Sequence, residues 1–363
     1  MAKKKLIVFI PSIEDGGVEK NLFIIVNYLS SKIENINLLT YDNKKKDKFK
    51  KKIKIKTPFI NFIKFNNRYP KYFLCLLLLI RILLFDRNYT ILTFQANIYV
   101  IIISKIFNIK VISRSNSSPS GWSNTPLKHS IFSFFFKKAD KIIVNSYDFK
   151  SEMDKKYKVN VECILNPFLF KKIKKLSLQK AKKIYSYKCL KIISVGRLTD
   201  QKDFMTLFKA VENVKNKIVQ LVIIGKGSNR SDLENFIMKR NLHKKIKMLG
   251  YKSNPFKYIR QADLFILTSK FEGSPNVLIE AQFLKKYIIS TNCPTGPRLI
   301  LKNGKLGSLV KVGDFKQISK IIENFKFDRK VKNKINLGFN NTKQYEYKIN
   351  CLKYFKVINK FLY

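Results

Sequence analysis

The amino-acid sequence predicts an α/β protein with two domains, each built on a parallel β-sheet. The 363 residues are enough for two domains at roughly 100–200 residues each. Short continuous apolar runs alternate with segments in which apolar residues recur at helical spacing, which is typical of strands and helices in a parallel sheet. The alternation occurs twice along the chain, with a polar, lysine-rich stretch in between. We therefore expect two Rossmann-like halves that face a cleft.

The first half begins with the apolar run Lys5–Pro11, which predicts a buried strand. A glycine-containing turn leads from it into a predicted helix over Val18–Leu29. Helical patterns separate the other predicted strands, which are Asn37–Tyr41, Thr90–Phe94, Lys110–Ser113 and Lys141–Asn145. We assign residues 1–168 to an amino-terminal domain and residues 169–188 to a linker.

The second half, residues 189–341, repeats the pattern. Its predicted strands are Leu190–Val195, Val219–Ile224, Ile246–Leu249, Leu264–Thr268 and Tyr287–Ser290. Its predicted helices are Phe204–Asn213, Ser231–Arg240, Phe256–Gln261 and Pro275–Leu284. Residues 342–363 predict a last, amphipathic helix that packs back across the domains.

The chain is strongly basic, with 73 Lys and Arg against 24 Asp and Glu and a formal charge of +49. A hydrophobic content of 45% excludes a disordered chain in spite of this charge. Lys outnumbers Arg about six to one, and Ile, Asn and Phe are abundant, so an A/T-rich genome accounts for much of the excess. Arg is the usual reader of bases and is scarce, so we expect no nucleic-acid partner. An anionic membrane surface or a phosphorylated substrate suits a lysine-rich surface better.

The sequence predicts a chain of the cytoplasm. The five cysteines lie far apart without a Cys-x-x-Cys pair, so neither a disulfide framework nor a zinc site is expected. No secretory signal is recognised, because the apolar run Leu6 to Ile10 is short.

Three segments bear on membrane contact. Lys44 to Lys56 holds nine Lys and one Asp, and is either an inner-leaflet contact or a solvated loop. Tyr72 to Phe85 is apolar but contains Arg81, and its 14 residues fall short of the roughly 20 needed to span a bilayer. A buried helix or a helix lying in the interface is expected there. Phe134 to Lys138 is a core helix edge or an interfacial anchor.

The first candidate site follows the strand Leu190–Val195. Gly196 lets the backbone turn, and Arg197 and Lys202 place two cations at the carboxyl end of the strand. Asp203 is suited to cap the next helix, whose amino terminus would favour an anion. The alternative is a solvated loop in a lysine-rich protein.

The second candidate site follows the strand Leu264–Thr268. Ser274 and Pro275 are good residues for the N-cap and first position of a helix, whose free N–H groups would point at the cleft. Glu272 precedes this helix and Glu280 lies inside it, with seven residues between them. The two carboxylates are suited to bind sugar or ribose hydroxyls; alternatively they are a general acid/base pair or surface charges.

These residues resemble a known family. The combination of GRLTDQKD (196–203), FEGSPNVLIEA (271–281) and TNCPTGPRLILKNGKLGSLV (291–310) resembles the family 4 glycosyltransferases, which retain the anomeric configuration and have the GT-B fold. Asp15 to Lys20 is similar to the family's amino-terminal glycine loop. The resemblance covers both domains and is densest from 189 to 312. The sequence of residues 291–310 is most similar to enzymes that build bacterial surface polysaccharides, including lipopolysaccharide, and lipid-linked oligosaccharides of the cell envelope. N-acetylgalactosamine transferases are among these enzymes.

The resemblance implies a division of roles between the domains. The amino-terminal domain would bind the acceptor and the carboxy-terminal domain the nucleotide sugar. Gly16 and Gly17 would let the backbone approach the donor phosphates or the acceptor closely, since a Cβ there would intrude. Asn116 would take the polar contact in a loop where many relatives carry His. His129 nearby falls in an apolar helical pattern and favours a packed or surface role.

The resemblance also implies the donor site. Arg197 and Lys202 would bind the donor diphosphate, Glu280 the nucleotide ribose and Glu272 the transferred sugar, so Glu272, Arg197 and Lys202 are the expected catalytic residues. The remaining donor-binding residues would be Gly196, Gly273, Ser274, Pro275, Asn276 and Val277. Gly225-Lys226-Gly227 is a turn or a minor nucleotide contact. Leu299 stands where relatives often have Glu, which bears on donor affinity or identity.

We therefore expect a retaining, metal-independent glycosyltransferase without a cofactor. It would move a sugar, such as an N-acetylhexosamine, from a UDP-linked donor to a lipid-linked or surface-glycan precursor at the inner face of the cytoplasmic membrane, as a peripheral protein. No Asp-x-Asp occurs among the 13 Asp, which argues against the metal-dependent GT-A fold. The alternatives are an epimerase of the GT-B fold acting on a nucleotide sugar, or a basic nucleic-acid-binding protein. The epimerase would need acid/base groups beyond Glu272, and the latter would need interleaved Arg and aromatic residues.

Overall fold

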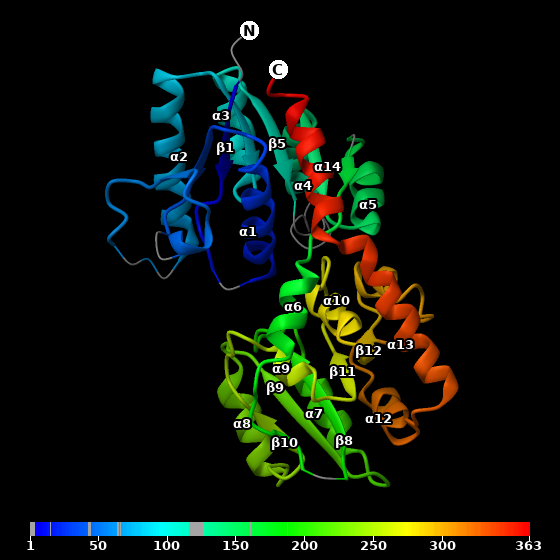
Figure 1. The fold of residues 1–363 in the computed structure, drawn as a ribbon. Helices are drawn as coiled ribbons and strands as arrows, with labels where there is room; N and C mark the ends of the chain where they lie inside the picture. The colour runs from blue at the N-terminus through cyan, green and yellow to red at the C-terminus, as the bar shows by residue number, and fades with distance from the viewer. Residues whose placement is uncertain are drawn as a thin grey trace. The chain divides into compact units, whose positions relative to one another are not determined.

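The computed structural model consists of two units, each with one parallel sheet (Figure 1). It describes residues 4–14, 16–42, 45–63, 65, 67–115, 126–159, 161–186 and 188–363, with residues 126–129 as backbone. Unit 1 comprises residues 1–168 and 345–363, and unit 2 comprises residues 169–344. The predicted α/β class with two parallel sheets is confirmed.

Unit 1 holds a seven-stranded sheet in the order β3-β2-β1-β4-β5-β6-β7. Its strands are β1 (Lys5–Phe9), β2 (Ile36–Leu39), β3 (Ile53–Lys56), β4 (Tyr89–Thr93), β5 (Lys110–Arg114), β6 (Lys141–Val144) and β7 (Val161–Cys163). The order reverses between β1 and β4, which is the topological switch point of a doubly wound sheet. The strands predicted from apolar runs are confirmed, whereas β3 and β7 were not predicted.

Helices cover both faces of this sheet, with α1 (Gly17–Leu29) and α14 (Tyr347–Asn359) on one face. The other face carries α2 (Arg68–Phe85), α3 (Asn97–Ile106), α4 (Pro126–Lys138) and α5 (Tyr147–Tyr157). Side chains alternate along each strand, so Leu6 and Val8 of β1 belong to one core while Ile7 belongs to the other. Two separate hydrophobic cores therefore hold unit 1 together.

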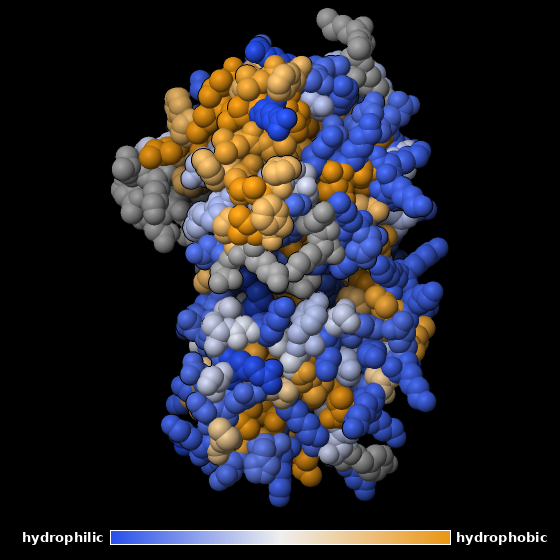
Figure 2. Space-filling view, turned by 90° about the vertical axis from the view of Figure 1, so that its left-hand side faces the viewer, coloured by the Kyte–Doolittle hydropathy of each residue, from blue (hydrophilic) through white to orange (hydrophobic). Residues whose placement is uncertain are grey.

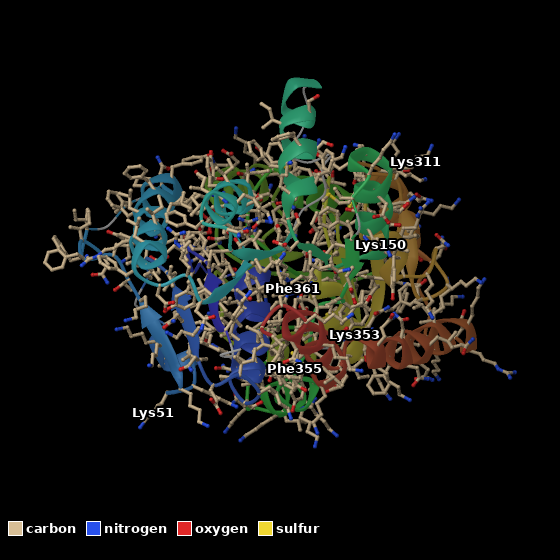
Figure 3. The ribbon with its side chains drawn as sticks, turned by 90° about the horizontal axis from the view of Figure 1, so that it is seen from above. Lys51, Lys150, Lys311, Lys353, Phe355 and Phe361 are labelled. Atoms are coloured by element: carbon tan, nitrogen blue, oxygen red, sulfur yellow. The ribbon has the colours of Figure 1, made fainter. Side chains whose placement is uncertain are left out.

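The carboxy-terminal helix α14 is part of unit 1. Cys351, Tyr354 and Ile358 are buried in the same core as α1. Phe355 and Phe361, labelled in Figure 3, pack partly buried against that core. The predicted last helix, residues 342–363, thus begins with a 3₁₀ turn over Thr342–Tyr345, and α14 then packs against α1 of the first domain.

Unit 2 holds a six-stranded sheet in the order β10-β9-β8-β11-β12-β13. Its strands are β8 (Leu190–Val195), β9 (Val219–Ile224), β10 (Ile246–Met248), β11 (Leu264–Leu267), β12 (Tyr287–Thr291) and β13 (Ser308–Val310). Its helices are α6 (Phe170–Ser177), α7 (Phe204–Glu212), α8 (Arg230–Lys239), α9 (Phe256–Ile259), α10 (Asn276–Phe283), α11 (Pro297–Ile300), α12 (Phe315–Glu323) and α13 (Arg329–Asn341). The predicted strands and helices are confirmed to within one or two residues.

The stretch predicted as a linker, residues 169–188, contains helix α6. Phe170 and Ile173 of this helix are buried, and the ring of Phe170 stacks on Phe283 of α10 at 4.5 Å between centroids. The sequence of α6 contains several lysines, so it reads as a polar linker. Its buried residues Phe170, Ile173 and Ser177 nevertheless fall on one face of the helix, at a spacing of three and four residues. Residues 170–177 therefore belong to the fold of unit 2.

None of the helices in the described ranges is long and apolar enough to cross a membrane. Within α2, Cys75, Leu79 and Leu83 are buried in the core of unit 1. Of the segment Phe134 to Lys138, Phe136 is buried and Phe134 is exposed. This segment is therefore an edge of the core, as one of the two predicted alternatives states.

Candidate active site

The candidate site of unit 2 lies where four neighbouring parallel strands end. β9, β8, β11 and β12 are adjacent in the sheet, so the loops after their carboxyl ends meet at one edge. These loops are residues 225–229, 196–203, 268–275 and 292–296. These loops contain both predicted candidate sites. The two sites are about 70 residues apart in the chain, and the order of the strands in the sheet brings them together.

Lys202 and Glu272 form the centre of this edge. The Nζ of Lys202 donates to Oε1 of Glu272, and the side chains are only 13% and 7% exposed. The Oγ of Ser269 donates to the same carboxylate oxygen at 2.6 Å. A lysine ammonium has three N–H donors, so the carboxylate orients this cation and leaves it able to donate to a further anionic group. Arg197 lies on the same loop and is exposed.

Backbone and side-chain hydrogen bonds join the loops after β8 and β11. The N–H of Lys270 donates to the carbonyl of Gln201 at 2.8 Å, and Nε2 of Gln201 donates to the carbonyl of Phe271 at 2.9 Å. The Oγ1 of Thr268 donates to the carbonyl of Lys202 at 3.1 Å. The position of the lysine relative to the carboxylate is therefore fixed by main-chain contacts.

Two glycines allow the loops to approach so closely. A Cβ on Gly225 would lie 1.8 Å from the carbonyl oxygen of Gly196. Gly296 has a φ of +81°, and a Cβ on it would lie 2.5 Å from the carbonyl oxygen of Gly273. A side chain at either place would push adjoining loops apart. Gly225-Lys226-Gly227, predicted as a turn, therefore supports the loop that holds Arg197 and Lys202.

Helix α7 begins directly after the Lys202 loop. Asp203 is its N-cap, and the Oδ1 of Asp203 accepts from the N–H of Thr206 at 3.3 Å. The predicted cap is therefore confirmed. Asp203 has a φ of +46°, a conformation that Asp tolerates better than most residues.

Helix α10 begins one residue later than predicted. Its N-cap is Pro275 rather than Ser274, and Asn276 is the first helical residue. The prediction failed because Pro275 adopts an extended ψ of 99°, so Ser274 lies too far back for its side chain to cap the helix. The first turn of this helix still lies at the edge that holds Glu272, and its Leu278 N–H donates to the carbonyl of Pro275 at 3.0 Å. Glu280, inside this helix, is 2% exposed.

The glycine loop of unit 1 follows β1 and opens α1. Gly16 is the N-cap and Gly17 the first helical residue. A Cβ on Gly16 would lie 2.6 Å from Oε2 of Glu19, so the carboxylate of Glu19 folds back against this glycine. Burial raises the pKa of the Glu19 carboxyl above its usual range. A side chain at position 16 would have to displace only the end of this flexible side chain, so the contact does not by itself require glycine.

A buried arginine marks the carboxyl end of β5. Arg114 is 0% exposed; its Nε donates to Tyr354 Oη at 2.7 Å and its Nη2 donates to Asn166 Oδ1 at 2.9 Å. Its guanidinium lies 5.1 Å from the ring centre of Phe94. Arg114 thereby connects α14 to the sheet of unit 1. The predicted Asn116, Asp15, Lys44 and the side chain of His129 lie outside the described residues.

Comparisons with known proteins agree with this arrangement. Residues 178–340 match the family model described as glycosyl transferases group 1. An N-acetylgalactosamine-N,N'-diacetylbacillosaminyl-diphospho-undecaprenol 4-alpha-N-acetylgalactosaminyltransferase from Campylobacter jejuni is 27% identical over 91% of this chain and 93% of its own length. An uncharacterized glycosyltransferase from Methanocaldococcus jannaschii is 34% identical over 56% of this chain, which spans about half (54%) of that relative's length.

The fold is similar to that of solved glycosyltransferase structures. The crystal structure of Anabaena HepE in complex with UDP and glucose superposes with a TM-score of 0.80 at 15% identity, over 98% of this chain and 100% of that one. The two Rossmann-like units are those of the GT-B fold. The match over residues 178–340 and the fold of both units agree with a glycosyltransferase of the GT-B fold. The resemblance to this fold expected from the sequence is confirmed.

The predicted donor residues gather in unit 2. Arg197 and Lys202 share the loop after β8, and Glu272 and Gly273 lie in the loop after β11. The remaining predicted residues Ser274, Pro275, Asn276, Val277 and Glu280 line or follow the start of α10, and Gly196 opens the Lys202 loop. Gly16 and Gly17 lie in unit 1. Leu299, in place of the family's usual Glu, is 36% exposed on α11, which follows directly after Gly296.

Sequence reasoning missed several residues that support the candidate site. Ser269 and Thr295 both bind Glu272, the former at its carboxylate and the latter at its backbone carbonyl. Gly296 allows the loop after β12 to approach the loop that contains Gly273. Their positions in the sequence could have revealed Ser269 and Thr295. Ser269 comes two residues after β11 and Thr295 four residues after β12, in the loops at the carboxyl ends of parallel strands, where ligands bind in such sheets.

Proposed function

We propose that this glycosyltransferase transfers a sugar from a UDP-linked donor, such as an N-acetylhexosamine, to a lipid-linked or surface-glycan precursor. The observation that supports this proposal most strongly is the ion pair between Lys202 and Glu272, in the loops that also contain Arg197 and lead into α10. It places cations, helix N–H groups and a carboxylate at one edge of one sheet. The cations suit a diphosphate, and the carboxylate suits the hydroxyls of a sugar.

The charges at this edge suit departure of a nucleoside diphosphate. As the bond between the sugar C1 and the β-phosphate oxygen breaks, negative charge develops on that phosphate. Lys202 and Arg197 would stabilise it together with the N–H groups at the start of α10. These are side chains and backbone groups of the protein, so we propose that transfer does not require a metal ion. Unit 2 would bind the donor and unit 1 the acceptor.

We propose that the anomeric configuration is retained. The acceptor oxygen would attack C1 on the side that the diphosphate leaves, and its proton would pass to an oxygen of the departing phosphate. One C–O bond then forms as the other breaks, and no side chain has to act as nucleophile. Glu272 would bind the transferred sugar and Glu280 the ribose of the nucleotide.

Two relatives support the choice of substrates. The HepE structure of the same fold was solved with UDP and glucose. The Campylobacter relative, which matches nearly the whole chain, is named for N-acetylgalactosamine transfer to a diphospho-undecaprenol acceptor. These properties belong to the relatives, and we propose them for this chain because the resemblance extends over both of its units.

A nucleotide-sugar panel tests the proposal. Thermal unfolding is recorded with UDP-N-acetylgalactosamine, UDP-N-acetylglucosamine, UDP-glucose and GDP-mannose. A donor at about 100 times its dissociation constant adds about 2.7 kcal/mol to the free energy of unfolding, which raises the melting temperature. The stabilising donor is then incubated with a polyprenyl-diphosphate-linked sugar, and the anomeric configuration of the product is read by NMR. Stabilisation by no nucleotide sugar, or an inverted product, would contradict the corresponding part of the proposal.

A further inference from the structure

Helix α2 presents an exposed apolar stripe. Phe73, Leu77 and Leu84 are 62%, 47% and 61% exposed, and Phe85 at the end of the helix is 86% exposed. Cys75, Leu79 and Leu83 face the core of unit 1 from the opposite side of the same helix. Positions 73, 77 and 84 recur at helical spacing, so they share one face. Figure 2 shows hydrophobic residues gathered over this side of unit 1 and bordered by hydrophilic ones.

The segment before α2 adds two exposed aromatic residues. Phe59 and Phe62 are 94% and 74% exposed. The Oη of Tyr41 lies 2.9 Å from the carbonyl oxygen of Ile60 and 2.7 Å from that of Ile63, so this segment is held against the core. We call the exposed residues Phe59, Phe62, Phe73, Leu77, Leu84 and Phe85 the α2 face.

The α2 face needs an explanation, because a helix that is apolar all round is normally buried on all sides. Here the core covers one side only. Large contiguous apolar patches on soluble proteins mark contact sites for other proteins or for membranes. The α2 face is therefore an interaction surface, and its neighbours decide which partner it fits.

The segment of the chain that leads into the α2 face is basic. Residues 45–56 hold eight lysines and one aspartate, and Lys46, Lys48, Lys50, Lys51, Lys52, Lys54 and Lys56 are exposed. They belong to the turn before β3 and to β3 itself, the edge strand of the sheet, which leads straight into Phe59. In Figure 3 Lys51 lies at the lower left, beside β3, and α2 lies at the upper left. Arg81 is exposed within the stripe, between Leu77 and Leu84.

We infer that the α2 face docks unit 1 onto an anionic lipid bilayer. Exposed aromatic and aliphatic side chains would enter the boundary between head groups and acyl chains, and the lysines of residues 45–56 would contact anionic head groups. Arg81 has a long side chain that keeps its charge at the interface while its stem lies among apolar groups. This inference rests on the proposed function in one respect only: a lipid-linked acceptor would explain why the protein binds a membrane.

Charge favours a bilayer over a second copy of the chain. In a two-fold dimer the same surface meets itself. Two α2 faces would then bring two lysine-rich segments toward each other, and this repulsion opposes association. An anionic bilayer has an apolar interior and negatively charged head groups, so it complements both the apolar residues of the α2 face and the lysines of residues 45–56.

Vesicle binding tests the inference. Full-length protein is sedimented with vesicles of phosphatidylcholine containing about one third phosphatidylglycerol, and with phosphatidylcholine alone. Wild-type protein should bind the anionic vesicles and bind them less as salt rises. The variant with Lys50, Lys51, Lys52 and Lys54 changed to Gln should bind at least about 30-fold more weakly. The variant Phe73→Gln, Leu77→Gln, Leu84→Gln should lose about 10-fold or more.

Matched variants in unit 2 control for total charge and hydrophobicity. Exposed residues there allow Lys316, Lys320, Lys330 and Lys332 to be changed to Gln, and Ile218, Met238 and Val312 to be changed to Gln. Both controls should bind vesicles like the wild type. Equal loss in the lysine control would mean that net charge alone attracts the protein, and this would overturn the assignment to residues 45–56.

Four further outcomes test the docking and separate it from the proposed function. Anionic-vesicle binding that is unchanged in the Phe73, Leu77, Leu84 variant overturns it. So does a wild-type dimer in sedimentation velocity that this variant converts into a monomer without any vesicle binding, because a second copy then covers the α2 face. A protein that binds vesicles but transfers no sugar overturns the proposed function alone. Transfer to a water-soluble acceptor without vesicle binding overturns the docking alone.

Discussion

The ammonium group of Lys202 lies against the carboxylate of Glu272, although 70 residues separate them in the chain. Both side chains are mostly buried in unit 2. Removing one partner of a buried ion pair leaves the other charge uncompensated, which costs more than the net worth of the pair. We therefore expect Lys202 to have two effects that mutation can separate, the proposed one on the donor diphosphate and one on the fold.

Lys202→Ala should lower turnover by ~10²-fold, because a group that stabilises the developing charge is lost. It should also lower the free energy of unfolding by about 2–4 kcal/mol, because the buried Glu272 loses its counter-ion. Lys202→Ala combined with Glu272→Gln should recover much of the stability but none of the activity. Steady-state release of UDP and urea unfolding measure the two effects. Full stability in the single variant would show that Glu272 does not need the lysine.

Arg197→Ala should lower turnover to a similar extent without changing stability. Arg197 is exposed and its Nη2 lies 3.5 Å from Gln201 Oε1, a contact too long to contribute much to the fold. The same kinetic and unfolding measurements apply. Near-wild-type activity in the Arg197→Ala, Lys202→Ala double variant would disprove the diphosphate assignment for both.

Transfer should continue in excess EDTA. The groups that we propose to stabilise the leaving diphosphate are Arg197, Lys202 and backbone N–H groups, so chelation removes nothing that the step needs. Initial rates are compared with and without EDTA at fixed ionic strength. Complete loss of activity that Mg²⁺ or Mn²⁺ restores would refute the metal-independent mechanism.

Gly296→Ala should reduce activity more than Gly313→Ala. Both glycines have positive φ, +81° and +78°, which L side chains rarely adopt, so both substitutions strain the backbone. Only at Gly296 would the added Cβ meet the carbonyl of Gly273, whereas nothing lies within 4 Å at Gly313. The difference between the variants therefore reports displacement of the loop that holds Glu272. Equal activities would show that this loop tolerates the shift.

Stability should depend on the titration of Lys286 in unit 2. Burial lowers the pKa of Lys286 to about 8, and its Nζ donates to the carbonyls of Arg260 and Ala262 at 2.8 and 2.7 Å. Between about 8 and the ordinary value of about 10.4 the unfolded chain binds more protons than the folded one, so the free energy of unfolding rises with pH. Lys286→Met should lose this rise, up to about 3 kcal/mol. Urea unfolding across that range should show diverging curves; parallel curves for wild type and variant would contradict the lowered pKa.

The strands that the sequence missed share one property. β3 and β7 are the edges of the sheet of unit 1, and β13 is an edge of the sheet of unit 2. Edge strands are short and partly exposed, so they lack the continuous apolar run that reveals a central strand. In β3 the pattern IKIK alternates apolar residues with lysine, and β7 and β13 have three residues each.

By itself the sequence determined the central strands of both sheets and the cap at Asp203, because these depend on local patterns of burial and turn chemistry. It also indicated the residues of the candidate site, through a resemblance that lies in short motifs. Only the tertiary structure decided that Lys202 meets Glu272, that Gly296 must be glycine, and that α14 packs on α1. These are contacts between segments far apart in the chain, and parallel strand order, not local propensity, brings such segments together. The same holds for the α2 face. Its apolar residues are visible in the sequence, but which of them the core covers and which remain exposed depends on the packing of unit 1.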